Sequence, residues 1–122
     1  MRTLFIPLAL IAATGAQAQQ TPRETDILYS QSELTQLVSG NMLELFTGGF
    51  SRYGADGTYD YRYEENGAPA PGTYEVRDDS FICTVFHNGF DRCDLFVHAN
   101  NRVVVIIENG ERYPVREITE LE

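Results

Sequence analysis

The sequence predicts a mainly β protein: a small antiparallel meander barrel or sandwich of about seven to eight strands with one short N-terminal helix. Turn signals recur about every 8–12 residues, a spacing typical of sandwiches and barrels. The segments between these turns are rich in aromatic and β-branched residues, which favour strands. Both cysteines flank an Asn-Gly pair in "FICTVFHNGFDRCDLF", as expected of a stapled hairpin.

The chain begins with the pattern of an export signal. An apolar stretch over 4–13 is followed by Ala-Gln-Ala at 16–18, the small-x-small pattern that signal peptidase reads. The apolar stretch is shorter than the about 20 residues that a membrane span needs. We therefore expect residues 1–18 to be a signal peptide and the processed protein to be periplasmic, or secreted where the host has no outer membrane.

One domain is expected after processing. The polar residues 19–26 are predicted to be a flexible leader, and 27–122 a single β domain. The net charge of −9 argues against nucleic acid as a partner, because phosphates require basic residues. The acidity permits a basic protein partner, and no membrane association is expected once the signal is removed.

The cysteine hairpin fixes a register. With His87-Asn88-Gly89 as a three-residue loop, Phe86 faces Phe90 and Cys83 faces Cys93. In an oxidising compartment this pairing predicts a disulfide. A metal site or a redox pair is the alternative, but zinc would need two further ligands and no Cys-x-x-Cys spacing is present.

Two further turns extend this pairing register to the following strands. As two-residue turns, Asn100-Asn101 sets Leu95 against Ile106, and Asn109-Gly110 sets Ile106 against Tyr113 and Val104 against Val115. One continuous apolar surface follows: Phe81, Cys83, Val85, Cys93, Leu95, Val97, Val104, Ile106, Tyr113 and Val115. The opposite face is mixed, yet more apolar than a solvated face: Ile82, Thr84, Phe86, Phe90, Arg92, Asp94, Phe96, His98, Val103, Val105, Ile107 and Arg112. We expect the N-terminal helix, another part of the chain or a partner to cover part of it.

The first half of the domain contains the helix. In "YSQSELTQLVSGN", Ser30 and Glu33 form a capping box and Gly40 ends the helix. Strands are predicted in "NMLELF", on both sides of Asp56-Gly57, and in "TYEV", with 65–72 as an exposed loop. The register at Asp56-Gly57 stays open between a two-residue turn and a three-residue turn, which would pair Tyr53 with Tyr59.

Two groups of side chains are candidate binding residues. Tyr59, Tyr61 and Tyr63 share a strand face with Tyr74 nearby, and could line a cup for a ligand or pack in the core. The mixed face offers a partner surface at Phe86, Phe90, Phe96 and Arg92.

No catalytic residue, metal site or cofactor is predicted. His87 and His98 share no spacing with other ligands, and no nucleophile elbow, phosphate loop or dinucleotide fingerprint occurs. We therefore expect a protein that is not an enzyme.

The segments "GGFSRYGADGTYDY" and "GTYEV", followed by the two cysteines, resemble small periplasmic lipocalin-like β domains of unknown function from alphaproteobacteria. The resemblance covers about 75 residues and implies a lipocalin-like β barrel with one disulfide. Periplasmic lysozyme inhibitors are similar in size, disulfide and architecture, but "SGNML" has Leu43 where their Ser-Gly-x-x-Tyr signature has tyrosine.

Three functions follow as hypotheses. The first is an exported, non-catalytic binding module whose partner is a protein. The alternatives are a small-ligand carrier of lipocalin type and an inhibitor of a basic cell-wall hydrolase.

Overall fold

The computed structural model describes residues 20–122, so the predicted signal peptide lies outside the described part. The elements are β1 (Ile27–Leu28), α2 (Gln31–Val38), β2 (Asn41–Leu45), β3 (Phe50–Tyr53), β4 (Thr58–Arg62), β5 (Ala70–Val76), β6 (Phe81–Phe86), β7 (Asp91–Ala99), β8 (Arg102–Ile106) and β9 (Arg112–Glu120). Strands β2 to β9 pair in chain order, all antiparallel, and β9 pairs again with β2. The mainly β prediction is confirmed as a closed eight-stranded barrel, to which β1 adds on the outside of the ring.

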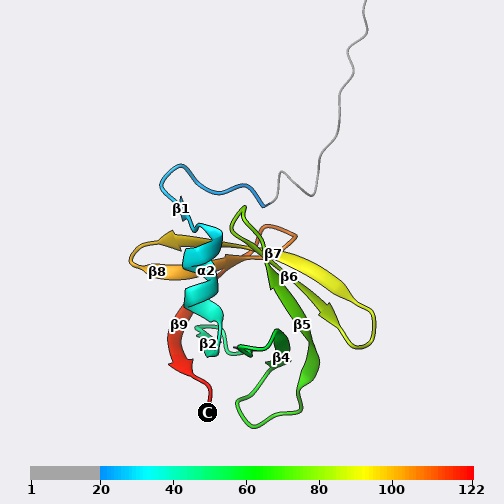
Figure 1. Cartoon of the computed structure of the whole chain (residues 1–122). Coiled ribbons are helices and arrows are strands. Elements are labelled where there is room, and N and C mark those ends of the chain that lie inside the picture. The colour runs from blue at the N-terminus through cyan, green and yellow to red at the C-terminus, as the bar shows by residue number, and fades with distance from the viewer. Residues whose placement is uncertain (1–19) are drawn as a thin grey trace, which may run out of the picture.

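The helix α2 closes one end of the barrel. The Ser30 hydroxyl accepts a hydrogen bond from the Glu33 amide at 3.1 Å, and the Glu33 carboxylate accepts one from the Ser30 amide at 2.9 Å, which is the predicted capping box. Leu34 and Val38 are fully buried among the barrel's interior side chains. Figure 1 shows α2 with the strands arranged around it.

In β6, β7 and β8, the residues that point into the barrel come from the face that the sequence showed as mixed, and the helix and strands β2 to β4 supply much of the remaining core. The buried core of the barrel consists of Leu34, Val38, Leu43, Tyr53, Tyr59, Ile82, Phe96, Val103, Val105 and Val115. The helix therefore covers part of this face, which was one of the three possibilities expected from the sequence. Because the barrel is closed, the face is enclosed by the other strands and is not a free sheet surface.

The predicted continuous apolar surface lies on the outside of the barrel and is smaller than expected. Leu95, Val97, Val104 and Ile106 form a second buried cluster with Phe81 and Ala99 beside them, which we call the outer cluster. The side chain of Val85, on the same face, is half exposed. Tyr113 and Val115 were placed on this face by the sequence and belong instead to the interior.

The N-terminal segment 20–28 lies along β7 and β8, whose outward side chains form most of the outer cluster (Figure 1). Gln20 Nε2 donates to the carbonyls of Cys93 at 3.0 Å and Ile106 at 3.1 Å. Asp26 accepts two hydrogen bonds from the Arg112 guanidinium at 2.8 and 2.9 Å. In the described part, 20–26, the predicted flexible leader is therefore tied to three strands, because its polar side chains reach carbonyls and a guanidinium.

One loop type connects four of the hairpins. In each, the residue before the loop donates its N–H to the carbonyl after it, and the third loop residue is a glycine with φ of 91° or 92°: Gly48, Gly57, Gly89 and Gly110. This is the three-residue loop predicted for the cysteine hairpin. It also resolves the open register, since Tyr53 pairs with Tyr59.

The same loop corrects the last hairpin. Because Glu108-Asn109-Gly110 is a three-residue loop, Val104 faces Pro114 and Ile106 faces Arg112. The predicted pairs Ile106–Tyr113 and Val104–Val115 are therefore both wrong by one residue. The Asn100-Asn101 turn is the predicted two-residue type, with φ of 54° and 66°. The pairs Cys83–Cys93 and Leu95–Ile106 are confirmed. Strand β5 begins at Ala70, inside the loop expected over 65–72.

Candidate ligand-binding site

The barrel end opposite α2 contains a cavity of about 390 Å³. The hairpin loops at this end contribute Thr47 and Asn88 to its edge. Its lining combines aliphatic, aromatic and a few polar side chains: Leu43, Leu45, Thr47, Ser51, Tyr53, Tyr61, Tyr63, Ala70, Phe86, Asn88, Phe90, Arg92, Asp94, Val105, Ile107 and Tyr113. Small-molecule sites are typically concave, of about 300–1,000 Å³, and mainly apolar with few polar groups.

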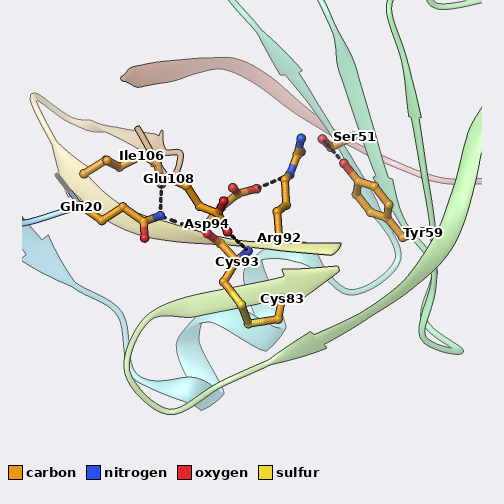
Figure 2. Close-up of polar contacts among 9 residues, drawn as sticks. All are labelled: Gln20, Ser51, Tyr59, Cys83, Arg92, Cys93, Asp94, Ile106 and Glu108. Carbon is orange, nitrogen blue, oxygen red and sulfur yellow. Dashed lines mark hydrogen bonds and ion pairs between the residues drawn. A yellow bond between two sulfur atoms is a disulfide. The ribbon is translucent and has the colours of Figure 1, made fainter. Parts of the chain in front are cut away.

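An ion pair lies within the cavity lining. Arg92 and Asp94 both come from β7, two residues apart, so that they share the inner face of the strand. Arg92 Nε donates to Asp94 Oδ2 at 3.2 Å. The Arg92 guanidinium also lies 5.7 Å from the centre of the Phe86 ring. In Figure 2 both side chains extend to the side of β7 away from the disulfide.

Asp94 is the most unusual group of the site. It is only 5% exposed, and its Oδ1 atom has no hydrogen-bond partner among the described residues. Burial raises the pKa of Asp94 to about 6, against the opposing effect of Arg92. Buried polar atoms are nearly always hydrogen-bonded in native proteins, so this oxygen calls for a partner.

In the wall of the cavity, the hydroxyl groups of Tyr59 and Ser51 are already hydrogen-bonded to each other. Tyr59 Oη and Ser51 Oγ lie 2.9 Å apart, in hydrogen-bond contact (Figure 2). Burial raises the pKa of Tyr59 to about 12 and that of Tyr53 well above its usual value. Both phenols therefore stay neutral across the physiological range and present no charge to the cavity.

The four tyrosines predicted as ligand-binding residues occupy two different kinds of position. Tyr61 and Tyr63 line the cavity, with ring centres 5.2 Å apart and Tyr63 83% exposed at the edge. Tyr59 is buried and packs on Tyr53, with ring centres 5.0 Å apart. Tyr74 packs on Tyr53 at the same distance and donates its hydroxyl to the Gly54 carbonyl at 2.8 Å. Two of the four candidates thus border the cavity, while Tyr59 and Tyr74 support its wall.

The residues predicted to form a partner surface also lie in different places in the structure. Phe86 and Arg92 line the cavity, and Phe90 stands at its edge with 66% of its surface exposed. Phe96 is fully buried in the barrel core and therefore does not reach a partner. The alternation along β7 was read correctly, but closure of the barrel turns that face inward.

The remaining predicted residues lie elsewhere. Cys83 and Cys93 form the expected disulfide, with an S–S distance of 2.05 Å, on the outer face of the barrel. His98 faces Tyr29, with Nδ1 3.3 Å from the phenol oxygen, and His87 sits in the β6–β7 loop. Over 20–122, no group of three or more histidine, cysteine or acidic side chains is arranged to hold a metal ion. No helix within that range has the length and apolar character needed to cross a membrane.

Several lining residues were not predicted as site residues: Leu43, Leu45, Ser51, Asp94, Val105, Ile107 and Tyr113. A signal for Asp94 was present in the sequence, because Arg92 and Asp94 are charged residues on an otherwise largely apolar strand face. Charged side chains two residues apart on such a face predict a pair enclosed by the fold.

No protein-family model matches the chain, and the searches of curated proteins and of solved structures found no significant match. The geometry of the site is therefore the basis on which a function can be proposed for the protein.

Proposed function

We propose that the protein is an exported, non-catalytic carrier of a small ligand, of lipocalin type, which binds in the open end of the barrel. The observation that carries the proposal is the cavity of about 390 Å³, lined mostly by apolar and aromatic side chains around one ion pair whose carboxylate is buried. Such a lining buries an apolar molecule and orients it by few polar contacts.

The arrangement supports binding and offers little for catalysis. The acidic group of the cavity, Asp94, is paired with Arg92, and the serine, Ser51, is bonded to Tyr59. Among residues 20–122, no histidine lines the cavity. The described lining of this cavity therefore contains neither a base-activated nucleophile nor a separated acid and base.

The geometry weakens one of the reasons for proposing a protein partner. That hypothesis used the excess apolar character of the mixed face, which now lines the barrel interior. Of the predicted partner residues, Phe90 alone is largely exposed, at the cavity edge. The small-ligand function, an alternative from the sequence, is therefore the one that the geometry supports best.

A fluorescent apolar probe tests the proposal. 1-N-phenylnaphthylamine should bind the folded protein in a 1:1 ratio with enhanced emission, because the cavity shields it from water. Leu45→Trp fills the cavity and should weaken binding at least tenfold. The matched control is Val85→Trp, on the outer face, which should leave the affinity unchanged. Absence of saturable binding, or equal loss in both variants, contradicts the proposal.

A further inference from the structure

The unpartnered oxygen of Asp94 restricts what the cavity can bind. Asp94 Oδ2 accepts from Arg92 Nε, whereas Oδ1 accepts from no described residue. A buried carboxylate oxygen without a hydrogen bond costs about 1–3 kcal/mol or more. A bound molecule that supplies a donor there would recover this free energy.

The other polar groups near the ion pair do not compete for that role. Ser51 and Tyr59 satisfy each other at 2.9 Å, and the Tyr74 hydroxyl donates to the Gly54 carbonyl at 2.8 Å. The Phe86 ring lies 5.7 Å from the Arg92 guanidinium, and most of the remaining lining is aliphatic or aromatic, with Thr47 and Asn88 at the edge. Among the described residues, Asp94 Oδ1 is therefore the buried polar side-chain atom of this cavity that has no hydrogen-bond partner.

We propose that the ligand is a neutral, largely aromatic molecule that carries an O–H or N–H donor, which Asp94 Oδ1 accepts within the barrel. This inference depends on the proposed function and specifies its ligand class. Offset or edge-to-face ring contacts with Tyr61, Phe86 and Tyr113 would hold the aromatic body.

Charge separates this class from carboxylic acids. Arg92 already neutralises Asp94, so a ligand carboxylate would compete with Asp94 for the guanidinium and bring two anions together. A cationic ligand would in turn leave an uncompensated charge beside Arg92. A neutral donor adds no charge and forms a hydrogen bond with an ionised acceptor, a bond stronger than a neutral pair.

The carboxylate must turn slightly to accept this bond. The Asp94 side chain is 7% exposed, but Oδ1 itself is shielded from solvent. The terminal torsion of aspartate is broad, so rotation about the Cβ–Cγ bond can bring an oxygen to the cavity. The Arg92 side chain, which is 32% exposed, has room to follow.

Four naphthalene derivatives with one ring system test the inference by calorimetry at pH 7.5. These are 2-(hydroxymethyl)naphthalene, its methyl ether, 2-methylnaphthalene and 2-naphthoate. The alcohol should bind at least tenfold more tightly than the ether, since a hydrogen bond to a charged group contributes about 1.5–3 kcal/mol. Naphthoate should bind most weakly.

Asp94→Asn tests the assignment of the acceptor. The Asn oxygen will turn to the donor Arg92 Nε, so that its NH₂ group faces the cavity. The alcohol-to-ether preference should then fall to about one. The matched control is Asp60→Asn on β4, which makes the same change in an ion pair with Arg52 and Arg62 but does not line the cavity. It should keep the preference.

The outcomes are distinguishable. If none of the four compounds binds, the proposed function is contradicted and this inference with it. If alcohol and ether bind equally, or naphthoate binds most tightly, this inference alone is overturned. The affinities of the alcohol and the ether for the unmodified protein test the inference even if Asp94→Asn does not fold. If folded Asp94→Asn still binds the alcohol more tightly than the ether, the role of Asp94 is overturned.

Discussion

At the scale of single residues, Asp94 is the residue of the cavity whose environment is most unusual. It has a raised pKa, a partner on one oxygen only, and a position on the inner face of β7. The charged groups facing it are Arg92 on the same strand and Glu108 in the β8–β9 loop, with the neutral phenols of Tyr53 and Tyr59 near the pair.

The pKa of Asp94 predicts a pH-dependent cost to stability. A carboxyl group whose pKa is raised by folding binds its proton more tightly in the folded state, so stability falls as pH rises from about 4 through about 6. Asp94→Asn removes this dependence. The stability of the variant relative to the unmodified protein should rise between pH 4 and pH 8, by up to about 3 kcal/mol.

Urea unfolding at the two pH values measures this difference, and Asp60→Asn provides the control for a general effect of losing a carboxylate. A relative stability of Asp94→Asn that is constant with pH would show that Asp94 titrates normally in the folded protein.

At the scale of elements, the repeated three-residue loop sets the barrel's registers. In three of the four loops the middle residue is Asp or Asn, whose side chain accepts from the amide two residues later: Asp56, Asn88 and Asn109. The sequence predicted this loop at the cysteines because the disulfide selects the register there. At Asn109-Gly110 no such constraint exists, and the dipeptide alone also fits a two-residue turn.

Gly89 tests the loop geometry. Its φ is 92° and a Cβ atom there would contact nothing within 4 Å, so any cost of substitution comes from the backbone conformation. Gly89→Ala should destabilise the protein by about 1–2 kcal/mol. Gly89→Asn should cost less, because asparagine tolerates the left-handed region. Equal losses for both variants in thermal unfolding would argue against this loop type.

The N-terminal segment 20–28 is attached to the barrel in a way that the hydropathy of the sequence does not indicate. Its contacts are polar, and only the fold brings Asp26 to Arg112. The Asp26 side chain is 1% exposed, and its pKa is lowered chiefly by hydrogen bonds from Arg112. The stability from this pair is therefore present near neutral pH and lost as pH falls below about 4.

Asp26→Asn should accordingly destabilise the protein by about 1.5–3 kcal/mol at pH 7, since the Arg112 guanidinium loses the charged acceptor of its two hydrogen bonds. Glu44→Gln makes the matched change in the more exposed pair with Arg116, and should cost less than about 1 kcal/mol. Chemical denaturation of both variants measures the contrast. Losses of similar size would mean that the N-terminal segment contributes little to the stability of the barrel.

At the scale of the whole molecule, the sequence predicts the mainly β class and the registers of β6–β7 and β7–β8, but not which face is enclosed. Alternation along β6 and β7 separates two faces correctly. Both faces are rich in apolar residues, so periodicity alone does not identify the interior. That depends on the β9–β2 pairing, which joins Asn41 to Glu120 and carries no turn signal. The cavity could not be predicted for the same reason.

The disulfide contributes to the stability of the molecule as a covalent cross-link between β6 and β7 on the outer face of the barrel. Replacing both Cys83 and Cys93 by serine should lower the free energy of unfolding by somewhat under about 3 kcal/mol, because the bridge closes a short loop. Ligand affinity should stay unchanged, since neither residue lines the cavity. A folded double variant that no longer binds the probe would contradict this separation of cross-link and site.

The measurement that most directly tests ligand binding in the barrel is a ¹H–¹⁵N NMR titration of the folded protein with 2-(hydroxymethyl)naphthalene. The account predicts saturable shifts centred on cavity residues of different strands, with Ser51, Phe86 and Asp94 among the largest. The outer cluster around Val97 and Val104 should change little. Shifts confined to that outer surface, or none at millimolar ligand, would contradict it.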